Sequence, residues 1–335
     1  SFDDYWNNER AYPVQSLVSR EQLDKIREQA RRAKAEEDET AKAKPPPPDD
    51  APMDLRKARF VWAPALVLVD KPGKIPLNGK GAGSAEPAQP GLVVRGGRPA
   101  TRQAAAATSD ESVVDGLLSL FDRARSELNI VSPYFVPGKD MKQALAAATA
   151  RGVKVRVLTN SLASNDAAAA HAGYARHRKE LLDMGVELYE MRSDDPAAAG
   201  TGQGSSSGQG ATGMFGSSGS ASVGGSSKAM LHSKLLTIDG RLIVIGSMNL
   251  DLRSQLQNTE IALVIRSEEL SRIANQRIEE GFRSGAWHVE SVDGQLHWRA
   301  PEGSGLADTT TEPQTTLGQR LMIRVLGPLA PDRLL

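Results

Sequence analysis

Apolar positions switch between helical and strand spacing through the middle of the chain. Residues 108–128 carry apolar side chains at helical spacing after Thr108 and Ser109, which are suitable helix caps. Five segments of alternating type follow: a strand at 129–136, a helix at 141–152, a strand at 153–161, a helix at 172–185 and a strand at 186–191. Gly152 and Gly185 stop the two helices. The pattern predicts an α/β fold with a mixed, largely parallel sheet covered by helices.

A second strand-rich stretch lies further along the chain. Residues 229–239 and 241–249 are predicted as adjacent strands, joined by a tight turn at Asp239-Gly240. A third strand at 261–265 and a helix at 267–285 come next. We expect these strands to join the same sheet.

The remaining segments have little core-forming pattern. Residues 19–44 are helix-forming and highly charged, which predicts a solvated helix that ends at four prolines, 45–48. Residues 61–70 are a predicted strand, and the Gly/Pro-rich residues 71–104 are a predicted loop. Residues 196–228 are rich in Gly, Ser and Ala, so we expect a flexible insertion that the fold does not need.

Composition excludes several kinds of chemistry. The 41 basic and 41 acidic residues cancel, so there is no global attraction to nucleic acid or anionic lipid. The absence of cysteine removes disulfides, thiolate metal sites and cysteine nucleophiles. The sequence also has no apolar run of about 18 residues, the length needed to cross a bilayer.

The candidate chemistry lies in the stretch HSKLLTID, residues 232–239, and in GSMN, residues 246–249. In a strand, His232 and Lys234 point to one face, and Ser247 and Asn249 do the same in the next strand. Leaving these polar groups buried without partners would cost about 1–3 kcal/mol each. A phosphate satisfies them all, because the lysine neutralises an oxygen, the serine and asparagine donate to it, and the histidine attacks phosphorus or protonates the leaving oxygen.

Two acidic residues accompany this group. Glu260 follows at a distance that allows its carboxylate to accept a hydrogen bond from the Nδ1–H of His232 and so orient the ring. Asp239 sits at the turn, where a structural hydrogen bond is favoured over direct chemistry. The alternative is a packed core histidine beside a surface lysine, which the complete pattern outweighs. The candidate catalytic residues are His232, Lys234, Asp239, Ser247, Asn249 and Glu260.

This pattern resembles the signature half-site of the phospholipase D superfamily. The segments at 2–14, 130–138, 157–191 and 311–335 are similar to its bacterial cardiolipin synthase subgroup. The resemblance implies a phospholipase D-like α-β-α sandwich in which two half-sites surround one phosphate. It also implies that one histidine forms a phosphohistidine, that the other acts as general acid and then base, and that no metal or cofactor is needed.

In that subgroup, the segment that resembles residues 2–7 follows the first half-site, so we expect this chain to lack that half. The expected organisation is the trailing part of a first half-domain with a charged helix and linker at 1–105, a second domain at 106–300, and a C-terminal tail at 301–335. His177 and Lys179 have the spacing of a substitute half-site. However, they diverge on a predicted helix, which favours a solvent-facing basic helix. His171, His288 and His297 lack a lysine two residues on and are expected to be packing or surface residues.

The resemblance implies a phosphatidyltransferase that passes a phosphatidyl group between phospholipids, such as phosphatidylglycerol and a second phospholipid. The implied partners are a membrane surface, reached peripherally in the bacterial cell envelope, and either an upstream half-site or a second copy. A phospholipase D, another phosphodiesterase or nuclease, or an inactive half-site fragment are the alternatives. Neutral charge and the lack of an Arg/Lys-rich groove argue against a nucleic-acid partner.

Three further segments are open to two interpretations. The strand ends carrying Ser132, Tyr134 and Phe135, and Thr159, Asn160 and Ser161, predict either substrate contact or loop packing. The ending at 318–335 combines apolar and arginine side chains, which suits a membrane interface and packing on the domain equally.

Overall fold

The computed structural model describes residues 2–8, 11–43, 59–75, 92–96, 112–194 and 230–329. The chain divides into two compact units, residues 1–62 and 63–335. Strands β1 and β2 belong to the sheet of the second unit, so the division lies before them and not at residue 105 as expected. The predicted insertion at 196–228 lies outside the described residues.

Three helices are described in the first unit: α1 (Phe2–Trp6), α2 (Val14–Leu17) and α3 (Arg20–Ala43). Helix α3 is the charged helix that the sequence predicts. Its ion pairs span one turn on exposed side chains, as in Lys25–Glu21 at 3.1 Å and Arg32–Glu28 at 3.0 Å. Exposed pairs of this kind stabilise a helix by only about 0.3–0.5 kcal/mol each.

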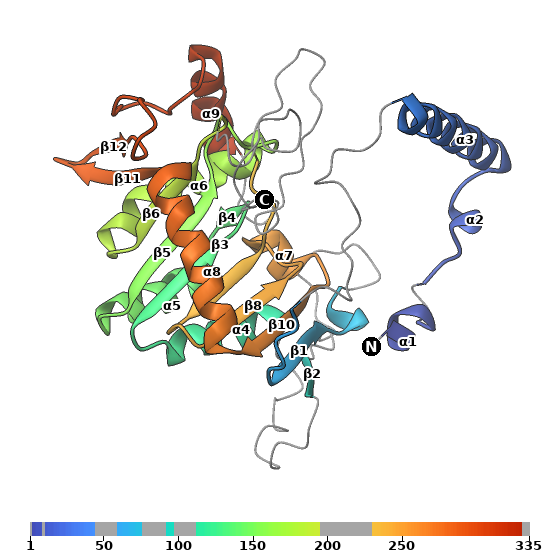
Figure 1. Ribbon diagram of the computed structural model, residues 1–335, viewed down its shortest axis with the longest axis horizontal. Helices are drawn as coiled ribbons and strands as arrows, with labels where there is room; N and C mark the ends of the chain where they lie inside the picture. Colours follow the sequence, from blue (N-terminus) through green and yellow to red (C-terminus); the bar gives the residue numbers. More distant parts are fainter. Residues whose placement is uncertain are drawn as a thin grey trace. The chain divides into compact units, whose positions relative to one another are not determined.

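The second unit is built around a ten-stranded sheet in the order β12-β11-β6-β5-β3-β7-β8-β10-β1-β2 (Figure 1). Its strands are β1 (Ala65–Asp70), β2 (Leu92–Gly96), β3 (Glu127–Val131), β5 (Lys154–Asn160), β6 (Glu187–Met191), β7 (Leu235–Ile238), β8 (Leu242–Gly246), β10 (Ile261–Arg266), β11 (Ala286–Val292) and β12 (Gln295–Arg299). A small second sheet pairs β4 (Phe135–Val136) with β9 (Leu250–Asp251).

The α/β class and the mixed sheet are confirmed, but the expectation of a largely parallel sheet is wrong. In the main sheet, as far as the structure describes it, only β3–β5 and β5–β6 pair in parallel. These are the strands joined by long helices, which is the connection that parallel pairing requires. The later strands are joined by tight turns or by returns that reverse direction, so they pair antiparallel.

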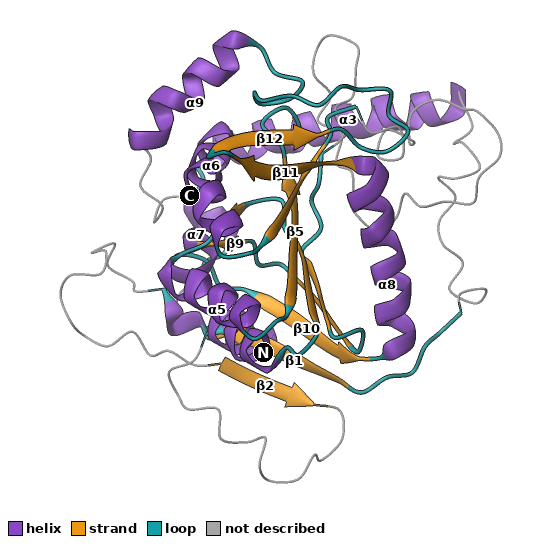
Figure 2. Ribbon diagram, turned by 90° about the vertical axis from the view of Figure 1, so that its left-hand side faces the viewer, coloured by secondary structure: helices purple, strands orange, loops and turns teal. Residues whose placement is uncertain are grey.

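Helices cover both faces of the sheet (Figure 2). The helices described in this unit are α4 (Val113–Arg123), α5 (Lys139–Ala150), α6 (Ala168–Asp183), α7 (Leu252–Leu256), α8 (Glu268–Glu280) and α9 (Leu317–Leu329). One core cluster buries the apolar sides of α4, α5 and α6, and a second buries Ala274 and Ile278 of α8 against the other face. This arrangement is the expected α-β-α sandwich.

Local signals explain where several elements begin and end. Helix α4 begins after Ser112, whose hydroxyl accepts from the Asp115 N–H while the Asp115 carboxylate accepts from the Ser112 N–H. The caps expected from the sequence, Thr108 and Ser109, lie outside the described residues. Gly152 and Gly185 each have φ +84°, the left-handed conformation that ends α5 and α6 as predicted.

Three strands of the main sheet differ from the sequence prediction. Strand β2 lies inside the stretch 71–104 that was predicted as loop, because VVR at 93–95 pairs with Val67–Val69 of β1 despite its glycine-rich surroundings. Strands β11 and β12 were not predicted. Their turn, Asp293-Gly294, has φ values of 49° and 75°, so the Asp-Gly pair was the signal that could have revealed them.

Candidate functional site

The predicted hairpin places the candidate residues together, but not on strands. The turn residues Asp239 and Gly240 have φ values of 52° and 62°, as a two-residue hairpin turn requires. However, β7 begins at Leu235 and β8 ends at Gly246. His232 and Lys234 therefore precede one strand, and Ser247 and Asn249 follow the other, so strand alternation does not orient them.

An open pocket of about 450 Å³ lies between these two chain segments. Its wall combines three of the predicted residues, His232, Lys234 and Ser247, with their neighbours Ser233, Leu235, Ile245 and Gly246. His232 is exposed, and its side chain has no hydrogen-bond partner among the described residues. The imidazole is thus free to meet a group that enters the pocket.

Lys234 is half-buried, and its Nζ donates to the main-chain oxygen of His232 at 2.9 Å. Burial lowers the pKa of Lys234, while the negative charges of Glu260 and Asp251 act in the opposite direction. Burial also raises the pKa of Asp251, and the charge of Glu260 adds to that shift. A cation and two carboxylates therefore share one partly desolvated region beside the pocket.

Ser247 and Glu260 form a short hydrogen bond, in which the serine hydroxyl donates to the carboxylate at 2.5 Å. The same hydroxyl accepts from the Ile261 N–H at 3.1 Å. The expected hydrogen bond from His232 to Glu260 is absent from the described part of the chain, so that prediction is wrong. The carboxylate orients Ser247 instead, and the serine can donate to a phosphate only by leaving it.

The main chain of Glu260 is held by Asp70, which the sequence analysis missed. Asp70 ends β1, is 1% exposed, and accepts from the Glu260 N–H at 2.9 Å and the Val113 N–H at 2.8 Å. Lys74 balances its charge at 2.5 Å and also donates to the Ser254 carbonyl at 3.1 Å. An acidic residue that closes an apolar strand (VLVD) was the available signal.

Asn160 holds the chain immediately before His232. Its amide nitrogen donates to the carbonyls of Leu231 at 3.0 Å and Pro133 at 3.2 Å, and its oxygen accepts from the Leu231 N–H at 2.9 Å. Asn160 is 1% exposed. Of the two interpretations of this strand end, the structure supports packing, and that packing positions the pocket.

Asn249 is half-buried, and its Oδ1 is buried with no hydrogen-bond partner among the described residues. Since amide oxygen and nitrogen are interchanged by a flip of the group, either atom can occupy this position. Asn249 therefore retains hydrogen-bonding capacity that the protein itself does not use.

Comparisons with known proteins identify the domain that carries this pocket. Residues 117–282 match the family described as "Cardiolipin synthase, PLD-like domain". Over 221 residues the chain is 36% identical to cardiolipin synthase C of Escherichia coli (strain K12), covering 65% of this chain and 43% of that protein. Residues 117–282 are a phospholipase D-like domain.

Two other similarities are weaker. The chain is 28% identical to cardiolipin synthase A of Serratia proteamaculans (strain 568) over 156 residues, which are 47% of this chain and 24% of that one. The crystal structure of the phospholipase D family member Nuc from Salmonella typhimurium matches 52% of this chain and 89% of its own, with 19% identity. The TM-score of this match, 0.35, is too low to support a conclusion about this chain. The chain spans less than half the length of these curated relatives.

Asp239 has a structural position in the phospholipase D-like domain. It lies at the opposite end of β7 from His232 and accepts from the main-chain N–H groups of Arg125, Ser126 and Glu127, at 3.0, 2.7 and 3.2 Å. Burial alone would raise its pKa, but these hydrogen bonds lower the pKa overall. Asp239 therefore joins the hairpin turn to the start of β3 and does not line the pocket.

The strand end at Ser132 packs in the phospholipase D-like domain as Asn160 does. Ser132 accepts from the Leu250 N–H at 3.2 Å and donates to the Tyr134 carbonyl at 2.8 Å, while Phe135 is fully buried. The Tyr134 hydroxyl donates to Asp166 at 2.5 Å, and burial together with Asp166 raises the Tyr134 pKa. Thr159 and Ser161 are buried as well, and their hydroxyls bond to neighbouring loop atoms.

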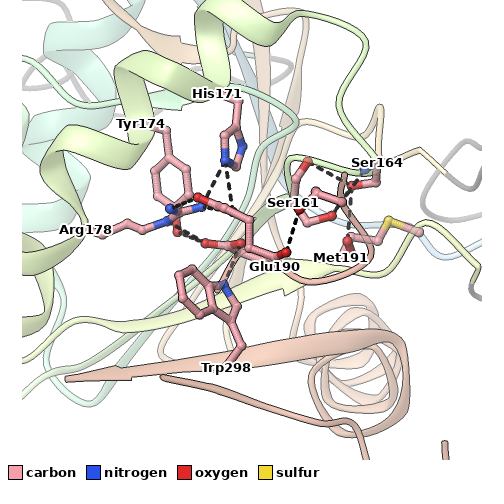
Figure 3. A network of polar contacts seen from close by, with 10 residues as sticks. Ser161, Ser164, His171, Tyr174, Arg178, Glu190, Met191 and Trp298 are labelled. Atoms are coloured by element: carbon pink, nitrogen blue, oxygen red, sulfur yellow. Dashed lines mark hydrogen bonds and ion pairs between the residues drawn. The ribbon is translucent and has the colours of Figure 1, made fainter. Parts of the chain in front are cut away.

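Residues 177–179, which have the spacing of a substitute half-site, contribute a buried arginine to this domain. Arg178 is 2% exposed and donates to Glu190 at 2.7 Å, to both carboxylate oxygens of Glu312, and to His171 at 2.9 Å (Figure 3). Tyr174 and Trp298 donate to Glu190, each at 3.0 Å. The expectation of a solvent-facing basic helix is wrong at Arg178, whereas His171 is a packing residue as expected.

His177 does not form a pocket with Lys179. Its ring lies 3.7 Å from Glu180, while the Lys179 amine contacts the Gly294 carbonyl. His288 is partly exposed and stacks on Tyr189. In the described ranges, no group of three or more His, Asp or Glu side chains is arranged to hold a metal ion.

Proposed function

We propose that this chain supplies one half-site of a phosphatidyltransferase that moves a phosphatidyl group from one phospholipid to the hydroxyl of another. The observation that carries the proposal is the pocket in which His232, Lys234 and Ser247 converge, within a domain that matches the cardiolipin synthase family. An exposed imidazole beside a partly desolvated ammonium is suited to a phosphodiester.

The proposed reaction has two steps, each a substitution at phosphorus. First, one histidine attacks phosphorus of the donor phospholipid, so that a P–N bond forms while the P–O bond to the departing alcohol breaks. The opposing histidine gives its proton to that oxygen. The acceptor's hydroxyl then loses its proton to this second histidine and attacks phosphorus, and the P–N bond breaks.

Within this scheme, His232 is the general acid and then the base, as the resemblance of the sequence implies, and the opposing histidine is the nucleophile. Lys234 balances charge on the phosphoryl oxygens, with its pKa supported by Glu260. Ser247 and Asn249 donate to the same oxygens, and Ser247 first exchanges its bond to Glu260 for one to the phosphate.

One histidine cannot be the nucleophile and the opposing acid at the same time, so a second half-site has to face this pocket. It comes from an upstream segment of the same polypeptide or from a second copy of the chain. We therefore expect residues 1–335 as a monomer to show little or no transfer. Robust turnover by a demonstrably monomeric sample would contradict this part of the proposal.

The substrates are phosphatidylglycerol and a second phospholipid, which the protein meets as a peripheral protein of the bacterial cell envelope. The similarity to cardiolipin synthases supports this choice. Among the helices that the structure describes, none combines the length and apolar character needed to cross a bilayer.

The test is a transfer assay with labelled phosphatidylglycerol in mixed vesicles, followed by separation of the lipid products. The protein is the complete natural polypeptide, or the chain in a demonstrated dimer. We expect His232→Ala to abolish transfer and His288→Ala, a partly exposed histidine outside the pocket, to leave it unchanged. Hydrolysis without transfer would indicate a phospholipase D, and cleavage of nucleic acid without lipid turnover would indicate a nuclease.

Trapping of the intermediate tests the assigned roles separately. The protein is quenched during turnover with a phosphorus-labelled donor and digested to peptides under alkaline conditions. We expect the label on a histidine of the second half-site. A label on His232 would reverse the two roles but retain the reaction class.

A further inference from the structure

Helix α9 presents one apolar side to the domain and another to solvent. Ile323 is 8% exposed and packs against Leu162 and Ala172. On another side of the helix, Leu317, Leu321 and Val325 are spaced four residues apart and are 77%, 62% and 56% exposed. Side chains at this spacing form one stripe along a helix, so the exposed stripe is separate from the side that Ile323 anchors.

The anchor of α9 is adjacent to the pocket. Leu162 belongs to the loop that follows β5, and Asn160 at the end of β5 holds Leu231, the residue before His232. Helix α9 packs against α6, which follows this loop (Figure 1). The exposed stripe is therefore carried by the same end of the sheet as the candidate catalytic histidine.

The positive charges of α9 favour a negatively charged partner. Its charged side chains are Arg320 and Arg324, and its sequence LGQRLMIRVLGPL contains no acidic residue. Arg324 is exposed and Arg320 is half-buried, with one hydrogen bond to Thr311 at 2.8 Å. A short helix with an apolar stripe and flanking arginines matches the boundary between acyl chains and anionic headgroups.

We propose that α9 docks the phospholipase D-like domain onto an anionic phospholipid bilayer, with Leu317, Leu321 and Val325 in the interface and the two arginines at the phosphates. Since α9 is tied to the loop beside His232, docking brings the pocket to the level of the lipid headgroups. The inference rests on the proposed function, because it supplies the route by which a phospholipid reaches that pocket.

Site-specific labelling tests the insertion. The chain has no cysteine, so Leu321→Cys and Val325→Cys each provide a single site for an environment-sensitive fluorophore. Gln276→Cys, on the exposed side of α8, is the matched control. With vesicles of equal phosphatidylglycerol and phosphatidylcholine, we expect a blue shift and quenching by brominated acyl chains at 321 and 325 only. Equal responses at all three positions, or none, would overturn the proposal.

Affinity provides a second measurement that does not depend on a label. The double change Leu321→Asp with Val325→Asp should weaken binding to these vesicles by at least about tenfold, since it removes two apolar side chains from the interface and adds two negative charges that the anionic headgroups repel. Ile273→Asp, at another exposed apolar position on α8, should change it less than about twofold. Circular dichroism of each variant serves as the check that it is folded.

If another protein surface covers the exposed stripe, the same variants give a different result. If the double change dissociates an oligomer in sedimentation but leaves vesicle binding intact, the stripe is a protein interface and the inference is wrong. Vesicle binding requires no turnover, so His232→Ala should bind like the wild type. Insertion of α9 without any lipid transfer would therefore refute the proposed function alone, and transfer without insertion would refute only the role of α9.

Discussion

Asn160 holds both polar main-chain groups of Leu231, donating to its carbonyl at 3.0 Å and accepting from its N–H at 2.9 Å. The two residues are 71 positions apart in the sequence. The side-chain amide replaces the neighbouring strand that this segment lacks, because β7 begins only at Leu235. The position of His232 therefore depends on a residue outside the pocket.

Asn160→Ala is expected to lower kcat in the lipid-transfer assay by about tenfold or more while changing KM little, because a shift of the catalytic group of about 1 Å costs much of the rate. Exchange of the Leu231 amide hydrogen should become faster in the same variant. The matched control is Asn165→Ala in the same region, whose side chain caps only the Ala167 N–H at 2.8 Å. Equal effects of both changes would show that Asn160 has no special role.

Glu260→Gln is expected to move the alkaline limb of the activity profile to lower pH. Burial already lowers the Lys234 pKa, and the charge of Glu260 opposes that shift. Without this charge the pKa of Lys234 falls further, so the lysine loses its proton at a lower pH. The measurement is kcat/KM against pH, with Glu290→Gln, a partly exposed carboxylate on β11, as the control. An unchanged alkaline limb would contradict the assigned interaction.

Gly246→Ala is expected to destabilise the second unit by about 1–3 kcal/mol. A Cβ at this position would lie 2.5 Å from the Ile261 carbonyl oxygen and 3.1 Å from the Ala262 Cα, and neither main-chain atom can move without opening the sheet. Gly318→Ala is the control, since its nearest neighbour would be Thr316 Oγ1 at 3.9 Å. Urea unfolding measures both, and equal stabilities would disprove the steric argument.

Glu190→Gln is expected to cost about 3–5 kcal/mol of unfolding free energy, because it removes the more deeply buried of the two carboxylates that compensate Arg178. The new amide also places two donors where Arg178, Tyr174 and Trp298 already donate. Glu290→Gln removes one partner of a partly exposed ion pair with Arg299 and should cost less than about 1 kcal/mol. Similar losses in the two variants would place the network among the ordinary surface pairs.

Glu312 should make stability depend on pH in the acid range. Burial alone would raise its pKa, but the positive charge of Arg178 and the hydrogen bonds that Arg178 donates lower it below the ordinary value of 4.5. The unfolded chain then binds the proton more readily, so the stabilisation is complete above about pH 4.5 and is lost as the pH falls below it. Unfolding free energies at pH 7 and pH 3.5 should therefore differ less in Glu312→Gln than in the wild type.

Features that depend on local geometry were predictable from the sequence. Helical and strand spacing indicated an α/β fold with helices covering a sheet, since each period reflects which side chains face the core. The stops at Gly152 and Gly185 and the turn at Asp239-Gly240 were predictable because each needs a left-handed backbone. The motif likewise indicated that His232, Lys234 and Ser247 lie together, because one hairpin joins them.

Partner choice between distant segments was decided only by the tertiary structure. Glu260 bonds to Ser247 and not to His232, because the pairing of β10 with β8 places Ile261 beside Ser247, the residue that follows β8. Asp70 and Asn160 hold the pocket through contacts 190 and 71 residues away in the sequence. The burial of Arg178 follows from Glu190 and Glu312, which come from separate elements. Spacing along the chain specifies which face a side chain occupies, but the register and packing of remote elements determine what it meets there.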